Sequence, residues 1–532
     1  MQHFKFHRKE LNLFGENHVN MVYNQAHFSQ FIQQPFSSNA FSKQIEDKSK
    51  EFMSKKREVL VSALKNQYAS VKNQENAMAL IESLANKNTF TVTTGHQLSL
   101  FTGPLFFVIK ILQAIKQAEE LSVQFPEKKF VPVYWMAAED HDFEEIQKAT
   151  IFSNELIWKS SQEGPVGRFD LDGLELVKNR ISELYANNPE SEIHSLIKHY
   201  DGENLTDAMR NIVHALFHDF NLLILDGDDS TLKREFSTIM KMELETSFSF
   251  DAVSKTNSEL EKVGGKVQIH AREINLFYIE KGLRSRIEKK DDDYFIEGKG
   301  HFKRDKIFSL LYDKPECFSP NVVLRPLYQE TILPNLAYIG GGGEIAYWLQ
   351  LKGVFDAAST IYPLIVVRNS MMIIDANTHK KIENTLSKLS DVFESTDTLK
   401  RNYVEANAGE ELNFDAMDNA LNQLGEIVVE QINHVDRGMD KFAAAEVVHL
   451  EKQIESIKDK LVKRSKGKHD AAMKQIEQIK ERLFPSGNLQ ERTINFFSFC
   501  PDGMYSELLK EMFNAIDPNE KDFIVLIENE KT

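Results

Sequence analysis

The strongest constraint on the fold is a strand, a helix and a second strand in direct succession. Residues 89–95 (TFTVTTG) are a short β-branched run closed by glycine, which is typical of a buried strand, and a helical pattern follows to about Leu121. Residues 129–146 begin as an apolar strand and end abruptly in five acidic residues, a histidine and a phenylalanine. This order predicts a βαβ unit, and therefore a parallel sheet.

Later stretches extend the same pattern. A helix is expected at 207–220, residues 150–210 look mixed, and residues 260–300 alternate between polar and apolar, which indicates antiparallel strands inserted in the core. Further buried strands with polar or glycine-rich ends are expected within 221–229, 335–355 and 361–370. The chain is therefore predicted to have an α/β core.

After this core the pattern becomes that of a coiled coil. Apolar residues recur at alternating steps of three and four between Phe414 and Leu461, with a slip of phase near 443–446. No proline interrupts residues 364–484. We expect a long helical domain here.

The second half of this domain should fold back on the first. The basic, polar stretch at 463–470 predicts a turn, and residues 471–484 then return as an antiparallel partner helix. Helices within 375–405 would add a third strand to the coil. Residues 484–497 lead back toward the core.

Length and charge narrow the class of protein. A chain of 532 residues exceeds what one hydrophobic core normally serves, so two or three domains are expected. The formal net charge of −16 disfavours nonspecific binding to nucleic acid or anionic membranes, but it leaves room for a local basic pocket that binds a nucleotide. Small molecules are the expected partners, with no nucleic acid and no membrane.

The sequence predicts a cytoplasmic protein. Its most apolar run is interrupted by Pro104 and Lys110 and is too short to cross a bilayer, and the N-terminus lacks the apolar core of a signal peptide. The two cysteines, Cys317 and Cys500, lie outside any paired motif. We expect a buried structural thiol at each, rather than a disulfide or a zinc site.

Polar loops follow the predicted strands, and these loops should meet at one edge of the sheet. They lie at 95–104, 138–144, 226–229, 340–344 and after Val367. Open parallel sheets bind ligands at that edge, because the loops converge there and helix N-termini point free N–H groups into the crevice. The sequence therefore predicts a small-molecule site.

The first loop combines glycines with hydrogen-bonding side chains. His96 would donate to a phosphate or to a developing negative charge, and Gln97 would bind a polar group. Thr102 and Gly103 close the loop before the helix. The spacing is not that of a P-loop, and a simple turn with a hydrogen-bonded histidine explains the pattern about equally well.

The second loop crowds Glu139, Asp140, His141 and Asp142 at the end of one strand. Their mutual repulsion requires a positive partner, which is a divalent cation, a substrate amine or an arginine. Asp, Glu and His are also the ligands of many metal sites. The alternative is a helix N-terminus at which the acids act as caps.

Four consecutive glycines, Gly340 to Gly343, precede the third helix of interest. Each raises the entropy cost of folding, so close approach of Gly341 and Gly342 to a ligand explains them better than packing does. Glu344 disfavours a phosphate and favours a cationic group such as an amine. Tyr347 either walls the pocket or belongs to the core.

Arg325 and Arg368 each follow an apolar stretch, and Gln329 lies one helical turn after Arg325. Both arginines would pair with carboxylates or phosphates of a ligand through two parallel hydrogen bonds. Alternatively, they neutralise the acidic loops.

Four motifs together resemble the BshC family, the cysteine ligases of bacillithiol biosynthesis. They are TTGHQLSLFTGPLF, PVYWMAAEDHDFEEI, LRPLYQETILPNLAYIGGGGEIAYWLQLKGVF and LFPSGNLQERTINFF, and they run in order from about residue 89 to 500. The first loop usually has the form Gly-Gln-Gln in this family, whereas here it is Gly95-His96-Gln97.

The resemblance implies a Rossmann-like parallel-sheet core with inserted segments, at about 150–210 and 250–315, and a long antiparallel coiled-coil domain. The expected domains are an N-terminal helical segment, the core, the coiled coil and a returning C-terminal segment, at 1–88, 89–372, 373–483 and 484–532. It also implies a homodimer, with the coiled coil as the contact.

The activity implied by the resemblance joins the carboxyl group of cysteine to the amine of glucosaminyl-malate. ATP or a related nucleotide is expected to activate the carboxylate. Residues 139–142 would bind Mg²⁺ or deprotonate the sugar amine, Glu344 would hold an ammonium group, and Arg325 or Arg368 the malate carboxylates. The alternatives are a nucleotidyltransferase-like or synthetase-like enzyme with another amino acid and amine, and a non-catalytic dimeric scaffold.

Overall fold

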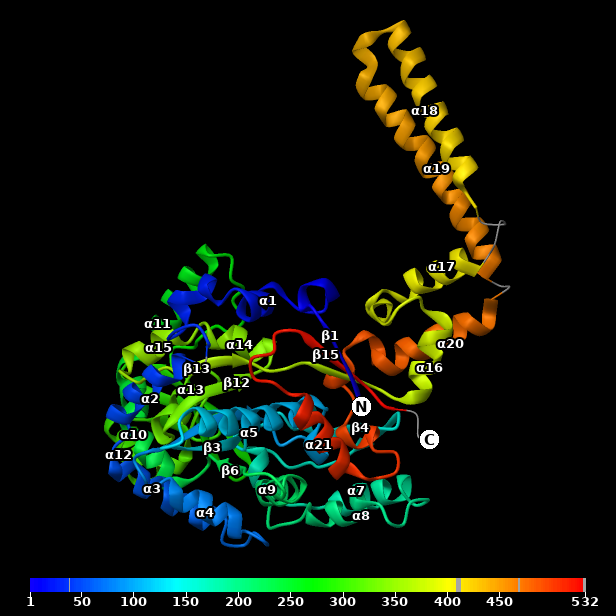
Figure 1. Cartoon of the computed structure of the whole chain (residues 1–532). Coiled ribbons are helices and arrows are strands. Elements are labelled where there is room, and N and C mark those ends of the chain that lie inside the picture. The colour runs from blue at the N-terminus through cyan, green and yellow to red at the C-terminus, as the bar shows by residue number, and fades with distance from the viewer. Residues whose placement is uncertain (38, 408–412, 467–468, 530–532) are drawn as a thin grey trace. The chain divides into compact units, whose positions relative to one another are not determined.

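The computed structural model describes residues 1–37, 39–407, 413–466 and 469–529 (Figure 1). Its internal contacts divide the chain into two compact units. The α/β unit consists of His3–Met372 and Glu491–Val525, and the helical unit is built on Ile373–Gln490 together with the two chain ends.

A five-stranded parallel sheet forms the centre of the α/β unit, as the sequence predicts. Its order is β13-β12-β2-β3-β6, and every neighbouring pair runs parallel. The strands are β2 (Thr89–His96), β3 (Lys129–Met136), β6 (Leu223–Asp226), β12 (Asn335–Gly340) and β13 (Leu364–Val367). The sheet grows from β2 through β3 and β6 on one side, and then through β12 and β13 on the other. This is a Rossmann-type order, and its direction changes between β2 and β12.

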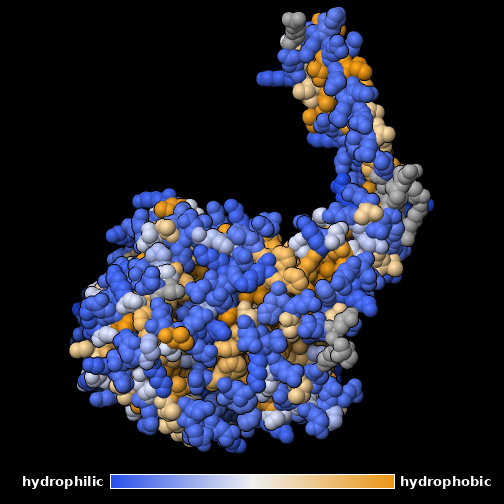
Figure 2. All heavy atoms as spheres, in the orientation of Figure 1, coloured by the Kyte–Doolittle hydropathy of each residue, from blue (hydrophilic) through white to orange (hydrophobic). Residues whose placement is uncertain are grey.

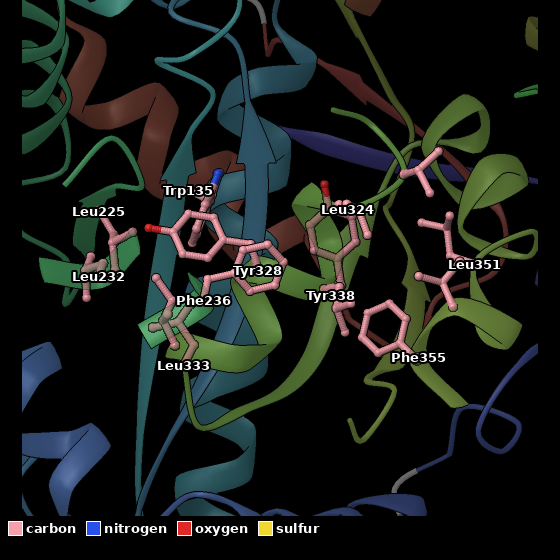
Figure 3. Packing of buried hydrophobic residues seen from close by; sticks show 14 of the residues in the cluster. Trp135, Leu225, Leu232, Phe236, Leu324, Tyr328, Leu333, Tyr338, Leu351 and Phe355 are labelled. Atoms are coloured by element: carbon pink, nitrogen blue, oxygen red, sulfur yellow. The ribbon is translucent and has the colours of Figure 1, made fainter. Parts of the chain in front are cut away.

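Helices cover both faces of this sheet, because successive strand side chains point to opposite faces. On one face, α2 (Ala40–Glu51) and α5 (Phe106–Gln124) share a core with strand residues such as Phe90 and Leu336. On the other face, a larger core includes α3 (Ser54–Gln67), α10 (Ser230–Thr246), α13 (Arg325–Ile332) and α15 (Lys352–Ala357). Figure 3 shows part of this second core, in which the Tyr328 ring lies 5.4 Å from that of Trp135 and 5.0 Å from that of Phe236.

A second, antiparallel sheet lies within and just after the insertion predicted at 250–315. Its order is β10-β9-β8-β7-β11. The strands are β7 (Leu276–Glu280), β8 (Leu283–Lys290), β9 (Asp293–Ile296), β10 (Gly300–Phe302) and β11 (Phe318–Pro320). The antiparallel strands are thus confirmed, although they form a sheet of their own. Residues 266–275, which were expected to be part of this alternation, contain no strand.

The mixed segment before β6 also has the predicted character. A short hairpin of β4 (Lys148–Ile151) and β5 (Asn154–Ile157) precedes helices. The helices of the inserted segments are α6 (Phe143–Ile146), α7 (Leu174–Leu184), α8 (Glu192–Leu196), α9 (Leu205–Leu216), α11 (Phe248–Lys262) and α12 (Arg304–Asp313). The helix expected at 207–220 is therefore α9, which ends four residues earlier than predicted.

The N-terminal segment, which was expected to be helical within 1–88, contains α1 (Glu16–Tyr23), α2, α3 and α4 (Glu75–Ser83). The sequence did not indicate the first strand, β1 (Gln2–Phe6). It belongs to a three-stranded sheet of order β1-β15-β14, with β15 (Phe523–Ile527) and β14 (Met371–Ile374). The last helix, α21 (Tyr505–Ala515), contacts α5.

The helical unit contains a long hairpin, but the turn is not where the sequence places it. The chain reverses between α18 (Asp415–Val435) and α19 (Asp440–Lys466), which pack along each other (Figure 1). At the reversal, the Asp436 carboxylate accepts a hydrogen bond from the Gly438 N–H. The slip of phase noted near 443–446 reflects this reversal a few residues earlier. The heptad-like spacing alone does not show it, because both arms of a hairpin carry the same pattern.

The remaining helices of this unit form a separate small core. They are α16 (Ala376–Thr385), α17 (Thr396–Asn407) and α20 (Asp470–Leu483). Buried residues of α17, α19 and α20, such as Leu399, Val462 and Ile476, pack together. Helix α20 is therefore a partner of α16 and α17 rather than the returning arm of the coil. The turn predicted at 463–470 lies partly outside the described residues.

Two further predictions concern membranes and thiols. In the part of the chain that the structure describes, no helix has both the length and the apolar character needed to cross a bilayer. Both cysteines are free thiols. Cys500 is buried as predicted, whereas Cys317 is only half-buried, so the prediction of a buried thiol is wrong there.

Candidate active site

A cavity of about 650 Å³ lies at the carboxyl edge of the parallel sheet. Its size is in the range of small-molecule sites. One wall comes from the ends of β2, β3 and β12, with α13 and α14 (Gly342–Trp348), and the other comes from the antiparallel sheet and the segment before it. The first wall spans β2 and β12, where the strand order reverses. Ligands of open α/β sheets bind at such switch points.

Gly95, near the end of β2, allows this wall to close. A Cβ at this position would lie 3.1 Å from the Tyr338 hydroxyl and 3.6 Å from Nη1 of Arg325. Arg325 also donates hydrogen bonds to Gln329 Oε1, at 3.2 Å, and to the Tyr347 hydroxyl, at 3.5 Å. The glycine therefore allows close approach of the protein's own side chains.

His96 follows Gly95 and lines the cavity. Its ring lies against the edge of Phe106, with centroids 5.1 Å apart, and Nε2 has no hydrogen-bond partner among the described residues. Burial, reinforced by the nearby Lys110 ammonium, lowers the pKa of His96 to about 3. His96 is therefore neutral near pH 7, with one ring N–H to donate and one ring nitrogen to accept.

Lys110 and Glu344 form an ion pair that the sequence analysis did not assign. Lys110, on the first turns of α5, donates to Glu344 Oε2 at 2.7 Å and also to the Gly95 carbonyl. Glu344 further accepts from the Tyr338 hydroxyl at 2.8 Å and from the Gly341 N–H at 2.9 Å. Burial alone would raise the pKa of Glu344, but Lys110 and these hydrogen bonds hold it below its ordinary value.

This pair changes the interpretation of the glycine-rich loop. The cation that Glu344 was expected to attract is supplied by the chain itself. The signal was present in the sequence, because Lys110 is the one charged residue in the apolar run at 98–115. A lysine in a buried stretch requires a partner.

Part of the acidic loop after β3 also meets its own cations. Asp140 accepts hydrogen bonds from Gln97 Nε2 at 3.0 Å and from the His141 N–H at 2.8 Å. Arg284 of β8 donates to His141 Nδ1 at 2.8 Å. Burial would raise the pKa of Asp140, but the Gln97 hydrogen bond and the Arg284 charge lower it overall. The arginine alternative for this loop is thus the one that the structure contains.

Glu139 is placed differently, at the buried end of the loop. It lines the cavity and pairs with Lys233 Nζ at 2.7 Å, and Lys233 pairs equally closely with Asp228. Arg168 holds Asp228 through two hydrogen bonds, of 2.6 and 2.8 Å. Burial raises the pKa of Glu139 although Lys233 opposes the shift. The two neighbouring carboxyl groups Glu139 and Asp140 therefore have pKa values shifted in opposite directions.

The other predicted residues are not part of the cavity lining. His141 and Asp142 are exposed, and His141 contacts the lining residues Asp140, Phe277 and Arg284. Thr102 and Gly103 lie in the buried turn behind His96, where Gly103 has a φ of +68° that favours glycine. Gln329 is fully buried behind Arg325.

The glycines and the second arginine have packing roles. A Cβ on Gly342 would lie 2.3 Å from His18 Nδ1, and one on Gly341 would lie 3.4 Å from Arg368 Nε. Arg368 is buried and holds Glu491 through two hydrogen bonds, of 2.6 and 3.0 Å. Gly341, Gly342 and Arg368 are therefore not part of the cavity lining, and their contact with a ligand stays a prediction. The side chains that these residues pack against belong to segments far away in sequence.

The structure adds a group that the sequence analysis missed. Arg272, Arg284 and Arg286, with His270, line the cavity from the antiparallel sheet and the segment that precedes it. The complete lining contains five lysine or arginine residues against three aspartates or glutamates. The alternation around β8 was noted, but nothing in it indicated which face would meet the ends of β2 and β12.

The lining suits an anionic ligand better than a metal ion. Over the described ranges, no group of three or more His, Cys, Asp or Glu side chains is arranged to hold a metal. Glu139 and Asp140 already have cationic or hydrogen-bonding partners. We therefore derive no step through a metal ion. The excess of cations fits phosphates or carboxylates.

Fold and cavity define a class: a Rossmann-like α/β protein with a small-molecule site at the switch point of its sheet and an additional helical hairpin. Comparison with known proteins is consistent with both parts. Residues 7–369 match the family model "Bacillithiol biosynthesis BshC, N-terminal Rossmann-like domain", and residues 371–528 match "Bacillithiol biosynthesis BshC, C-terminal coiled-coil domain". The chain belongs to the BshC family.

Similar proteins share most of their length with this chain. A protein of Flavobacterium johnsoniae named "Putative cysteine ligase BshC" is 38% identical over 490 residues, which cover 91% of this chain and 92% of the relative. A protein of the same name from Cytophaga hutchinsonii is 37% identical, with 87% of each chain covered. One from Chlorobaculum tepidum is 28% identical over 84% of each chain. The family predicted from the four motifs is therefore confirmed.

Proposed function

We propose that this protein is a ligase that joins the carboxyl group of cysteine to the amine of glucosaminyl-malate, the last step of bacillithiol biosynthesis, in the cytoplasm. The observation that carries the proposal is the pair Glu139 and Asp140, two adjacent carboxyl groups near the switch point whose pKa values are shifted in opposite directions. Such a pair supplies a proton acceptor and a permanent negative charge in one site.

The amine is the group that these carboxylates would handle. An ammonium group must lose a proton before its nitrogen can attack an activated carboxyl carbon, and a carboxylate whose pKa is raised is a better acceptor for that proton. Glu139 therefore takes the proton as the C–N bond forms, while the bond between the cysteine carbonyl carbon and the oxygen of its activating phosphoryl group breaks and that group leaves. Asp140 stays ionised and orients the incoming ammonium group.

The carboxyl group of cysteine requires activation, since an unactivated carboxylate has no adequate leaving group. ATP is the expected source of this activation. The lining offers its phosphates Arg325, which lies beside the ends of β2 and β12 and has no ion-pair partner among the described residues, and His96 lines the same cavity. Neutral His96, whose Nε2 is free among the described residues, would donate a hydrogen bond to the oxygen on which negative charge develops.

The helical hairpin favours a second copy of the chain as partner. Hydrophobic residues are visible along the hairpin in Figure 2. The exposed large apolar side chains of its two helices and their connection are Leu424, Ile427, Val435, Met439, Phe442, Val448, Ile457 and Leu461. Apolar residues at coiled-coil spacing that a two-helix hairpin leaves exposed are typical of a helix-bundle interface. We therefore place a homodimer contact here. Sedimentation of the full chain should show a dimer, and Ile427→Asp should shift it toward the monomer.

The reaction is tested by incubating the protein with ATP, cysteine and glucosaminyl-malate and following the product by mass spectrometry. The expected product has the mass of the two substrates joined with loss of water, and it forms only when all three compounds are present. Product formation with a different amino acid or amine would instead support the synthetase-like alternative. Absence of any nucleotide-dependent product would contradict both and would favour a scaffold.

A further inference from the structure

The antiparallel sheet presents a row of arginines to the cavity. Arg284 and Arg286 are two residues apart on β8 and therefore lie on the same face, and Arg286 pairs across the sheet with Phe277 of β7. The opposite face carries Tyr278 and Ile287, which are buried in the large core. The register of β8 thus determines that its arginines point toward the cavity.

The three arginines differ in how far the protein itself uses them. Arg284 lies 3.8 Å above the Phe277 ring and donates to His141, which fixes the plane of its guanidinium group, and its Nε has no partner among the described residues. Arg272 and Arg286 are exposed toward the cavity, and within the described part of the chain neither forms an ion pair.

The charged residues that line the cavity include more cations than anions. Lys110 is matched by Glu344, and Arg284 lies close enough to Asp140 to affect its pKa. Arg325, on the other wall, has no ion pair but donates hydrogen bonds to Gln329 and Tyr347. Among the described residues the side chains of Arg272 and Arg286 have neither kind of partner, in a chain whose formal net charge is −16. Cations that have no ion-pair partner and are concentrated in one cavity of an acidic protein call for an anionic ligand.

We infer that Arg272, Arg284 and Arg286 form the subsite for the two carboxylates of the malyl group of the amine substrate. This inference rests on the proposed function. A guanidinium group binds a carboxylate through two parallel hydrogen bonds, so the two free arginines match the two carboxylates, while Arg284 is held in place between the sheet and the acidic loop. The subsite lies across the cavity from the wall of β2 and β12. The sugar amine then reaches Glu139 while the malyl group stays on the arginine wall.

Binding of glucosaminyl-malate, measured by titration calorimetry, tests the subsite. Arg272→Gln and Arg286→Gln should each weaken binding by about 10- to 100-fold, since a hydrogen bond to a charged group is lost. Both positions are exposed, so the variants should keep the melting temperature of the wild type. Binding of glucosamine, which lacks the malyl group, should not change in either variant.

A matched control separates this effect from a general change of charge. Arg180 is exposed on α7, outside the cavity, and among the described residues its one ion pair is with neighbouring Glu183. Arg180→Gln should bind glucosaminyl-malate like the wild type. Arg286→Lys should recover part of the lost affinity, because it restores the charge without the two-pronged geometry.

The remaining outcomes would overturn the inference in different ways. If both cavity variants bind glucosaminyl-malate normally but lose affinity for ATP, the wall belongs to the nucleotide, and the proposed function still stands. If glucosamine binding falls as much as that of glucosaminyl-malate, the arginines do not recognise the malyl group. If the wild type binds no glucosaminyl-malate at all, the proposed function fails, and the subsite fails with it.

Discussion

The two walls of the cavity differ in whether their charged side chains have partners within the protein. On the wall made by β2, β12, α13 and α14, Lys110 and Glu344 neutralise each other and are hydrogen-bonded to the backbone at Gly95 and Gly341. Arg325 on the same wall donates hydrogen bonds to Gln329 and Tyr347. On the wall of the antiparallel sheet, Arg272 and Arg286 have no ion-pair partner among the described residues. A charged side chain that has a partner within the protein stabilises the structure of the site. A charged side chain without such a partner is available to bind a ligand.

In the acidic loop between the two walls, the neighbouring residues Glu139 and Asp140 differ in the direction of their pKa shifts. Asp140 is kept ionised by Gln97 and Arg284, while burial raises the pKa of Glu139. Chemical type alone does not distinguish two adjacent carboxylates. Their burial and their hydrogen-bond and ion-pair partners distinguish them.

The largest effect is expected from Glu139→Gln, which removes the proposed proton acceptor but keeps the shape of the side chain. The rate of product formation should fall by about 100- to 10,000-fold, the range that general acid–base groups contribute. Mass-spectrometric product assays at several pH values would measure it. Glu175→Gln, on the exposed surface of α7, is the matched control. An unchanged rate in Glu139→Gln would show that Glu139 has a structural role and does not accept the proton.

Removing the internal pair should affect folding more than binding. Lys110→Met leaves Glu344 without its cation, so the free energy of unfolding should fall by about 3 kcal/mol in urea denaturation. Adding Glu344→Gln should recover part of the loss, and the double-mutant cycle isolates the coupling between the two residues. If Lys110→Met is as stable as the wild type, the ion pair with Glu344 does not stabilise the fold, and the proposed difference between the two walls is wrong.

A smaller effect should appear in the pH dependence of stability. The folded-state pKa of His96, about 3, lies below its unfolded value near 6.5, so the unfolded state binds more protons between these limits. The stability that His96 contributes is present above pH 6.5 and is lost progressively as the pH falls toward 3. His96→Gln cannot titrate, and its unfolding free energy should decline less over this range than that of the wild type. Identical pH profiles would mean that His96 is more accessible than its surroundings indicate.

Much of the site edge was predictable, because it follows from the alternation of strands and loops. The carboxyl ends of parallel strands share one edge, so His96, Gln97, Glu139, Asp140 and Glu344 were all expected there, and all five line the cavity. The failures arose where a residue has a partner that is distant in sequence. Arg368 is held by Glu491, and Gly342 lies against His18, in each case more than a hundred residues away.

The turn of the coiled coil failed for a related reason. Apolar spacing shows that a helix has one buried side, but it does not say which helix covers it. The pattern therefore predicted α18 and α19 as helices, yet assigned the reversal to 463–470 instead of Asp436–Met439.

By itself, the sequence determined the parallel sheet, the edge at which polar residues gather, the helical hairpin as a class, and the family. These follow from local periodicity and from motifs that are contiguous in the chain. Only the tertiary structure decided which charges are satisfied internally and which remain free for a ligand. That depends on distances between residues such as Lys110 and Glu344, 234 positions apart, and on which face of β8 meets the ends of β2 and β12. Coulomb energies depend on distance and burial, and neither is encoded in the local spacing of one segment.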